Sequence, residues 1–122
     1  MNIKLEILFC LSESPIKEVG LLESLLNAPM NKIPVARISY RLKRIRDAIS
    51  ELRRDCWRIE EDNGGYTLHE RHLDILRRAF GSNGSARCLM YDWMNYHQLR
   101  KFTPERLDAE MIIRKERIHA KR

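Results

Sequence analysis

The chain lacks the features that would place it in several large classes of protein. No apolar window of about 18 or more residues occurs, so no segment is expected to span a membrane. The first residues lack the uninterrupted apolar run and small-residue cleavage site of a secretory signal. No internal repeat or extended low-complexity tract occurs either. These absences predict a globular, cytoplasmic chain.

Cysteine is scarce, and its positions do not indicate a metal site. The three cysteines are Cys10, Cys56 and Cys88, and no pair has the close spacing of a structural zinc site. An odd number of widely spaced cysteines is typical of a reducing compartment, where thiols serve as small hydrophobic residues. We therefore expect neither a disulfide nor a bound metal.

Motifs for catalysis are also missing. His69 and His72 fall at an expected strand–helix junction, and no motif places a nucleophile or oxyanion donor near them. Gly64-Gly65 lacks the Lys-Ser/Thr that follows in a phosphate loop. Surface histidines and a simple turn are the expected roles. The sequence therefore predicts a protein that is not an enzyme and needs no cofactor.

Positive charge is abundant and concentrated in two segments. The 122 residues carry a net charge of +6. Residues 1–34 carry three Lys/Arg against four Asp/Glu, whereas residues 35–58 carry eight against three, a local +5. Residues 114–122 carry five basic residues against one acidic, a local +4. Clustered positive charge attracts polyanions and releases their counterions, which favours a nucleic-acid partner.

Hydrophobic spacing predicts a mainly α-helical chain. Helices are expected over about 2–11, 16–26 and 70–80, and 27–34 is expected to be a loop because it holds two prolines and two asparagines. The best-marked helix begins near Val35. Its apolar residues follow a 4, 3, 4, 3, 4 spacing that forms one narrow stripe: Ile38, Leu42, Ile45, Ile49, Leu52 and Cys56.

A β-hairpin is expected directly after this helix. Trp57 and Ile59 alternate with Arg58 and Glu60, and Tyr66 and Leu68 follow the Asp62-Asn63-Gly64-Gly65 segment. Period-two alternation around Asn-Gly-Gly is a strong local hairpin signal. The fold class expected is therefore mainly α with a small β-hairpin.

The residues after the helix expected at 70–80 are predicted to form a linker and a helical arm. Residues 81–85 (GSNGS) are the most linker-like in the chain. Residues 86–101 predict an aromatic-rich helix, and Thr103-Pro104 predicts the start of the last helix. We therefore expect a domain over 1–80, a linker over 81–85 and an arm over 86–122.

The expected order of helix, helix, helix, hairpin and helix resembles the winged helix-turn-helix domains of bacterial and phage regulators over about residues 2–80. Residues 52–60 (LRRDCWRIE) are similar to the biotin-repressor pattern, which has glycine where this chain has Cys56. Alternatively, residues 41–46 (RLKRIR) with 64–68 (GGYTL) are similar to response-regulator output domains. Either resemblance implies a winged helix-turn-helix over these residues. The C-terminal helical arm, expected from the pattern of residues 86–122, lies outside the resemblance.

The resemblance implies that the helix from Val35 is a recognition helix that enters the major groove of double-stranded DNA. Arginine is suited to this, because its planar fork matches phosphates and guanine edges. A small, cytoplasmic transcriptional regulator is the implied function. The residues implied in DNA contact are Arg37, Tyr40, Arg41 and Arg44, with Lys43 and Arg46 on the backbone and Asn63 and Gly64 in the wing.

Two features keep other interpretations open. Glu60, Glu61 and Asp62 would repel a nearby phosphate backbone, so the wing is expected to tilt away from DNA and add little affinity. Alternatively, it contacts a protein or sets binding specificity by excluding wrong approaches. A winged-fold interaction module without DNA binding, such as an assembly or inhibitor protein, is therefore the first alternative. The second is a single-stranded nucleic-acid binder that uses the aromatic helix.

The aromatic helix more often serves as core or as a subunit interface. Winged-helix regulators frequently read two-fold sites as dimers, so the arm is expected to form a homodimer or to bind a protein partner. The interface residues expected are Leu89, Met90, Trp93, Met94, Tyr96, Met111 and Ile118.

Overall fold

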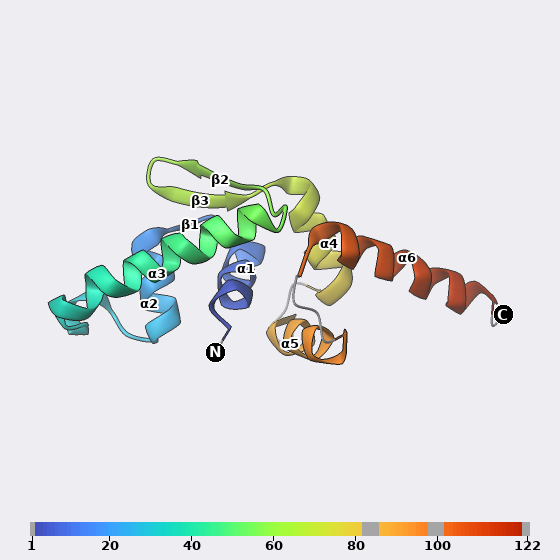
Figure 1. Cartoon of the computed structure of the whole chain (residues 1–122), viewed down its shortest axis with the longest axis horizontal. Helices are drawn as coiled ribbons and strands as arrows, with labels where there is room; N and C mark the ends of the chain where they lie inside the picture. The colour runs from blue at the N-terminus through green and yellow to red at the C-terminus, as the bar shows by residue number, and fades with distance from the viewer. Residues whose placement is uncertain (1, 82–85, 98–101, 121–122) are drawn as a thin grey trace.

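Six α-helices and a small three-stranded antiparallel sheet form the described part of the chain (Figure 1). The computed structural model describes residues 2–81, 86–97 and 102–120, with side chains for 2–81, 88–93, 95 and 102–112. The expected mainly helical fold with a β-hairpin is confirmed. In chain order the elements are α1 (Ile3–Glu13), β1 (Ile16–Lys17), α2 (Glu18–Leu26), the 3₁₀ turn η1 (Met30–Lys32), α3 (Val35–Arg54), β2 (Ile59–Asp62), β3 (Gly65–Leu68), α4 (Glu70–Phe80), α5 (Ala86–His97) and α6 (Pro104–Ala120).

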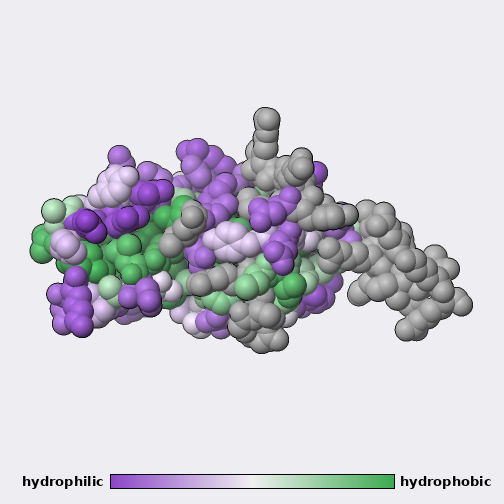
Figure 2. All heavy atoms as spheres, turned by 90° about the horizontal axis from the view of Figure 1, so that it is seen from below, coloured by the Kyte–Doolittle hydropathy of each residue, from purple (hydrophilic) through white to green (hydrophobic). Residues whose placement is uncertain are grey.

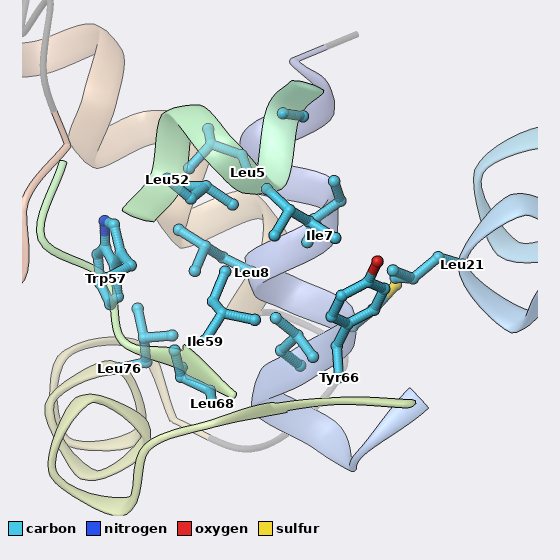
Figure 3. Close-up of a cluster of buried hydrophobic side chains, with 14 of the residues drawn as sticks. Leu5, Ile7, Leu8, Leu21, Leu52, Trp57, Ile59, Tyr66, Leu68 and Leu76 are labelled. Carbon is cyan, nitrogen blue, oxygen red and sulfur yellow. The ribbon is translucent and has the colours of Figure 1, made fainter. Parts of the chain in front are cut away.

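Helix α1 forms the centre of the core. It packs against α2, α3, α4, α5 and β3, and Leu5, Ile7 and Leu8 are each 2% exposed or less. A helix that is apolar on most sides is stable only when neighbours cover it. Figure 3 shows these side chains meeting residues from α3, the hairpin and α4.

Helix α3 is buried along only part of its length. Its buried residues are Ile45, Ala48, Ile49 and Leu52, all in the C-terminal half. Lys4 of α1 forms ion pairs with Glu51 at 3.8 Å and Asp55 at 3.4 Å, which hold this half against the core. The apolar stripe expected from the sequence is therefore correct at its centre, but it does not bury the start of the helix.

The end of α3 is a Schellman motif with cysteine at the left-handed position. The backbone N–H of Cys56 donates to Arg53 O (3.1 Å), and that of Trp57 donates to Leu52 O (3.0 Å). Cys56 has φ +75°, a conformation that glycine adopts at little cost. Cys56 is exposed rather than part of the apolar stripe, and Cys88 is also exposed. The expectation of buried thiols therefore holds only for Cys10.

The hairpin lies where the sequence predicts it. Strands β2 and β3 pair antiparallel, with Glu60 opposite Thr67 and Asp62 opposite Gly65. Asn63 (φ +51°) and Gly64 (φ +75°) form the two-residue turn. Two consecutive positive φ angles are the signature of a type I′ turn, whose twist matches that of the strands.

One strand was not anticipated from the sequence. Ile16 and Lys17 form β1, which pairs with Tyr66 and Gly65 of β3, so the sheet order is β1-β3-β2. The expected helix from Ile16 therefore begins two residues later, at Glu18. Two residues are too few to show a period-two pattern, so only the pairing with β3 reveals this strand.

The C-terminal helices share the core of the preceding residues. Trp57 is 1% exposed, its Nε1 donates a hydrogen bond to Phe102 O, and the two rings stack at 5.4 Å. Tyr91 of α5 donates to Glu6 Oε1 of α1 (2.9 Å). One hydrophobic cluster includes residues from both sides of 81–85, so this segment does not separate two cores. Residues 82–85 themselves lie outside the described residues.

This packing changes the role of two expected interface residues. Met90 is 2% exposed and Trp93 6% exposed within the single chain, so neither has surface left to bury against a second copy. They pack inward because α5 lies on α1 and α4. Leu89 is 45% exposed and Met111 is partly buried. The side chains of Met94, Tyr96 and Ile118 lie outside the described residues.

None of the helices in the described part of the chain is long and apolar enough to cross a bilayer.

Helix α6 projects most from the molecule, and its second half extends away from the body (Figure 1). At the opposite end of the molecule, the start of α3 extends in the other direction. The long axis of the molecule therefore ends in helix on both sides.

Candidate nucleic-acid interface

The first half of α3 contains no fully buried residue, although Ile38 and Leu42 are partly buried against the core. None of residues 35–44 is fully buried, and Val35 is 83% exposed. At 1.5 Å per residue, these ten residues extend for about 15 Å, which is comparable to the width of the DNA major groove. Figure 1 shows this end of α3 projecting beyond α1. The chain therefore presents a helix end of suitable size for a groove.

The projecting half of α3 is strongly basic. Residues 35–46 contain five basic residues and no acidic residue. Arg37, Lys43 and Arg44 are exposed, and Arg41 is partly buried. Among the residues whose side chains are described, none of these four forms an ion pair with a carboxylate. Their charge is therefore directed to solvent rather than neutralised within the fold.

The exposed side chains of this half fall on one side of the helix. Arg37, Tyr40 and Arg44 are spaced by three and four residues, which places them on one face over two turns. Tyr40 is 61% exposed, an unusual exposure for a large aromatic side chain. Arg37 and Arg44 are about 10.5 Å apart along the axis, or roughly three base-pair steps. The face combines two guanidinium groups with an aromatic ring between them.

Arg46 differs from the other basic residues of α3. Its Nε lies 2.7 Å from Glu18 Oε1 at the start of α2. That oxygen is buried and accepts no hydrogen bond from the described residues, so the ion pair is what offsets its burial. Although 61% of the Arg46 side chain is exposed, its positive charge is partly neutralised by Glu18. The structure therefore separates Arg46 from the other expected DNA-contacting residues.

The N-terminus of α3 adds partial positive charge to this surface. Its N-cap is Pro34, which supplies no side-chain hydrogen bond, and the first turn contains no acidic residue. The first backbone N–H groups of a helix carry the positive end of the helix dipole. In α3 the N–H of Arg37 donates to Pro34 O at 2.9 Å. Lys32, which is exposed in η1 just before the helix, extends the basic surface. Lys32 and Arg37 line the same hollow. The sequence did not predict this, because 27–34 was expected to be a loop.

The hairpin turn points towards the same end of the molecule as the start of α3 (Figure 1). Asn63 and Gly64 are exposed at this turn, and a Cβ added at Gly64 would meet nothing within 4 Å. Glu60, Glu61 and Asp62 are also exposed, and Glu60 forms an ion pair with Arg58 at 3.4 Å. The turn is therefore accessible, but the strand leading to it is acidic.

The two histidines at the start of α4 have local structural contacts. His69 is the N-cap of α4, and its Nδ1 accepts a hydrogen bond from the backbone N–H of Arg71 (3.2 Å). His72 Nδ1 accepts from the backbone N–H of Arg58 (2.9 Å), and its ring meets Trp57 edge-on. Burial lowers the pKa of His72 below its usual value, and His69 and Arg71 lower it further. The ring of His72 therefore joins α4 to the residues that precede β2, whereas the ring of His69 caps α4.

No group of three or more potential metal-ligating side chains occurs within the residues that the structure describes. The surface with the most distinctive chemistry is therefore the basic start of α3. Comparison of the chain with protein-family models, with curated proteins and with solved structures finds no match.

Proposed function

We propose that this protein binds double-stranded DNA through the first half of α3, which enters the major groove as the recognition helix of a winged helix-turn-helix. The proposed role is that of a small transcriptional regulator of bacterial or phage type. The observation that carries the proposal is the projecting half-helix on which Arg37, Arg41, Lys43 and Arg44 have no carboxylate partner in the described residues.

An unpaired cluster of this kind favours a polyanion as partner. Ordinary solvated helices pair many of their charges at a spacing of three or four residues. Here the nearest acidic residue along α3, Asp47, follows the basic half rather than alternating with it. Binding to DNA would neutralise the repulsion among these cations and release counterions from the duplex. A polyanion therefore stabilises the clustered cations of this half of α3 more than water alone does.

The proposed contacts divide by chemistry. Arg37 and Arg44 are placed to reach base edges, because arginine donates two parallel hydrogen bonds to guanine. Tyr40 lies between them and offers its hydroxyl group and ring. Arg41 and Lys43 flank this face and are proposed to contact phosphates. Arg46, which is held by Glu18, contributes less than these residues.

The hairpin turn has a secondary role in this proposal. The exposed backbone at Asn63 and Gly64 is able to approach a phosphate, but Glu61 and Asp62 oppose that approach. A homodimer through the C-terminal helices is also proposed. Since Met90 and Trp93 are buried in the chain itself, exposed residues such as Leu89 and Ile112 would have to form its contacts.

Duplex binding is tested by selecting sites from random double-stranded DNA and measuring affinity by fluorescence anisotropy. Arg44→Ala, which removes a proposed base-edge contact, is expected to weaken binding by about 1–3 kcal/mol. Arg41→Ala, which removes a proposed phosphate contact, is expected to weaken binding to all duplex sequences about equally. Arg54→Ala is the matched control, because Arg54 is an exposed basic residue of the buried half of the same helix. It is expected to change affinity by less than about 0.5 kcal/mol.

The dependence on salt provides a second measurement. The logarithm of the association constant is expected to fall linearly with the logarithm of salt concentration, with a slope that becomes shallower by about one per phosphate contact removed. Affinity that is unchanged in both arginine variants, or that does not depend on salt, would exclude α3 from the interface.

A further inference from the structure

An apolar hollow lies beside the projecting half of α3. Its volume is about 120 Å³, and it is lined by Ile3, Leu22, Leu25, Leu26, Ile45 and Arg41. Leu22 and Ile45 are buried at its floor, whereas Ile3, Leu25 and Leu26 are partly buried at its sides. Figure 2 shows a continuous apolar area at this end of the molecule, bordered by hydrophilic residues.

A second hollow of about 180 Å³ continues from the first along α3. The two share Leu26 and Arg41, and the second adds Ile33, Lys32 and Arg37 among its lining residues. From Pro34 to Ile45 the combined surface, here named the α2–α3 groove, extends for about 16 Å along the helix axis. That length accommodates about three helical turns, as an amphipathic helix with anchors at i, i+4 and i+7 requires.

The charges at the edge of the α2–α3 groove are of one sign. Lys32, Arg37 and Arg41 are its charged lining residues. None of the three forms an ion pair within the part of the chain whose side chains are described. An apolar floor with a basic edge is complementary to a helix that has an apolar stripe flanked by carboxylates.

We infer that the α2–α3 groove is a docking site for an acidic amphipathic helix of a protein partner. The apolar stripe of that helix lies on Leu22, Leu25 and Leu26, and its carboxylates pair with Arg37 and Arg41. Arginine is well suited to this, because its fork pairs with a carboxylate through two hydrogen bonds.

A second copy of the chain fits the groove less well. Its projecting element is α6, and residues 114–122 carry five basic residues and one acidic residue. Seating this segment in the groove would bring like charges against Arg37 and Arg41, which is unfavourable. The charge of the groove therefore selects an acidic helix from another protein.

Docking there would also regulate the activity proposed above. Arg37 and Arg41 are proposed DNA contacts, so an acidic helix that pairs with them competes with the duplex. This consequence depends on the proposed function, whereas the docking itself does not. Binding is therefore measured without DNA first, so that a failure of either proposal is distinguished from a failure of the other.

The probe is a fluorescent helical peptide of about 18 residues, with leucines at i, i+4, i+7 and i+11 and glutamates flanking them. A second peptide carries lysine in place of every glutamate. Anisotropy is measured with the full chain at low salt. The acidic peptide is expected to bind at least about tenfold more tightly than the basic peptide, because only the former pairs with the arginines.

Two variants locate the binding site. Leu26→Gln, in a partly buried residue shared by both hollows, is expected to weaken the acidic peptide about tenfold. Arg41→Glu is expected to weaken the acidic peptide and strengthen the basic one. Val19→Gln is the matched control, because Val19 is a 45% exposed apolar residue of α2 outside the groove. Thermal melts check that each variant is folded.

Three results would overturn the proposal. They are no binding of the acidic peptide up to about 1 mM, equal binding of both peptides, or equal effects of Leu26→Gln and Val19→Gln. Concentration-dependent dimerisation that Leu26→Gln abolishes, measured by light scattering, would instead assign the groove to a second copy.

Discussion

The Nε of Arg46 lies 2.7 Å from Oε1 of Glu18, which joins the middle of α3 to the start of α2. Glu18 directly follows β1, so this ion pair also links α3 to the small sheet. The side chain of Glu18 is 23% exposed, and its Oε1 accepts no hydrogen bond in the described residues. Arg46 is therefore a structural residue, unlike Arg37, Lys43 and Arg44, which are exposed and have no carboxylate partner in the described residues.

The Arg46–Glu18 pair predicts a difference between two similar substitutions. Arg46→Ala leaves the buried oxygen without a positive partner, so we expect it to lower the free energy of unfolding by about 1–2 kcal/mol. Arg44→Ala removes an exposed arginine that has no carboxylate partner among the described side chains, and it is expected to change that energy by less than about 0.5 kcal/mol. Urea denaturation measures both, and equal losses would show that the ion pair does not stabilise the fold.

The acidic strand of the hairpin predicts a gain of affinity on neutralisation. If DNA binds as proposed, Glu61→Gln with Asp62→Asn removes two negative charges near the phosphate backbone. Affinity for a selected duplex is then expected to rise by about twofold to fivefold at low salt, and the gain is expected to shrink as salt increases.

Glu70→Gln is the control for this experiment, since Glu70 is an exposed acidic residue at the start of α4 rather than near the turn. Anisotropy titrations of the three proteins, in about 50 and 200 mM salt, provide the comparison. An unchanged affinity in the double variant would mean that the hairpin is tilted away from the duplex.

The left-handed conformation of Cys56 predicts a stabilising substitution. Residues with a side chain pay a steric cost of about 1 kcal/mol in this conformation, whereas glycine does not. Cys56→Gly is therefore expected to raise the free energy of unfolding by about 0.5–1 kcal/mol.

The same substitution elsewhere provides the control. Cys88 is exposed within α5, and glycine inside a helix is unfavourable by about 1 kcal/mol. Cys88→Gly is thus expected to destabilise the chain where Cys56→Gly stabilises it. Thermal melts under reducing conditions measure both, and destabilisation by Cys56→Gly would contradict the geometry at the end of α3.

The lowered pKa of His72 predicts that the fold loses stability in mild acid. Burial of the ring, with His69 and Arg71 nearby, lowers its pKa in the folded chain. The unfolded chain then binds more protons than the folded chain as pH falls below about 6.5, the ordinary histidine value. The free energy of unfolding is therefore expected to be greatest above that pH and to decrease as the pH falls towards the folded pKa.

His72→Asn tests this assignment, because the amide oxygen is able to accept the hydrogen bond from the Arg58 backbone without titrating. Urea titrations between about pH 5.5 and 7.5 are expected to give a flatter stability profile for the variant than for the native chain. A slope that the substitution leaves unchanged would mean that another group controls the acid sensitivity.

Local patterns in the sequence were sufficient to predict most of the secondary structure. The stripe from Ile38 to Leu52 identifies α3, and the Asn63-Gly64 turn fixes the hairpin, because both signals repeat within a few residues. The two-residue strand β1 and the inward packing of Trp93 left no such signal. Each depends on a partner distant in the chain, β3 for the strand and Phe102 for the ring.

For the candidate site, the amino-acid sequence alone determined the density of positive charge between Val35 and Arg46, since composition does not depend on folding. Only the tertiary structure decided which of these charges remain available. Arg46 is close enough to Glu18 to form an ion pair, whereas Arg37, Arg41 and Arg44 extend beyond the core and have no carboxylate partner in the described residues. The physical reason is that an ion pair requires two side chains within a few ångströms, and the packing of α2 against α3 sets that distance.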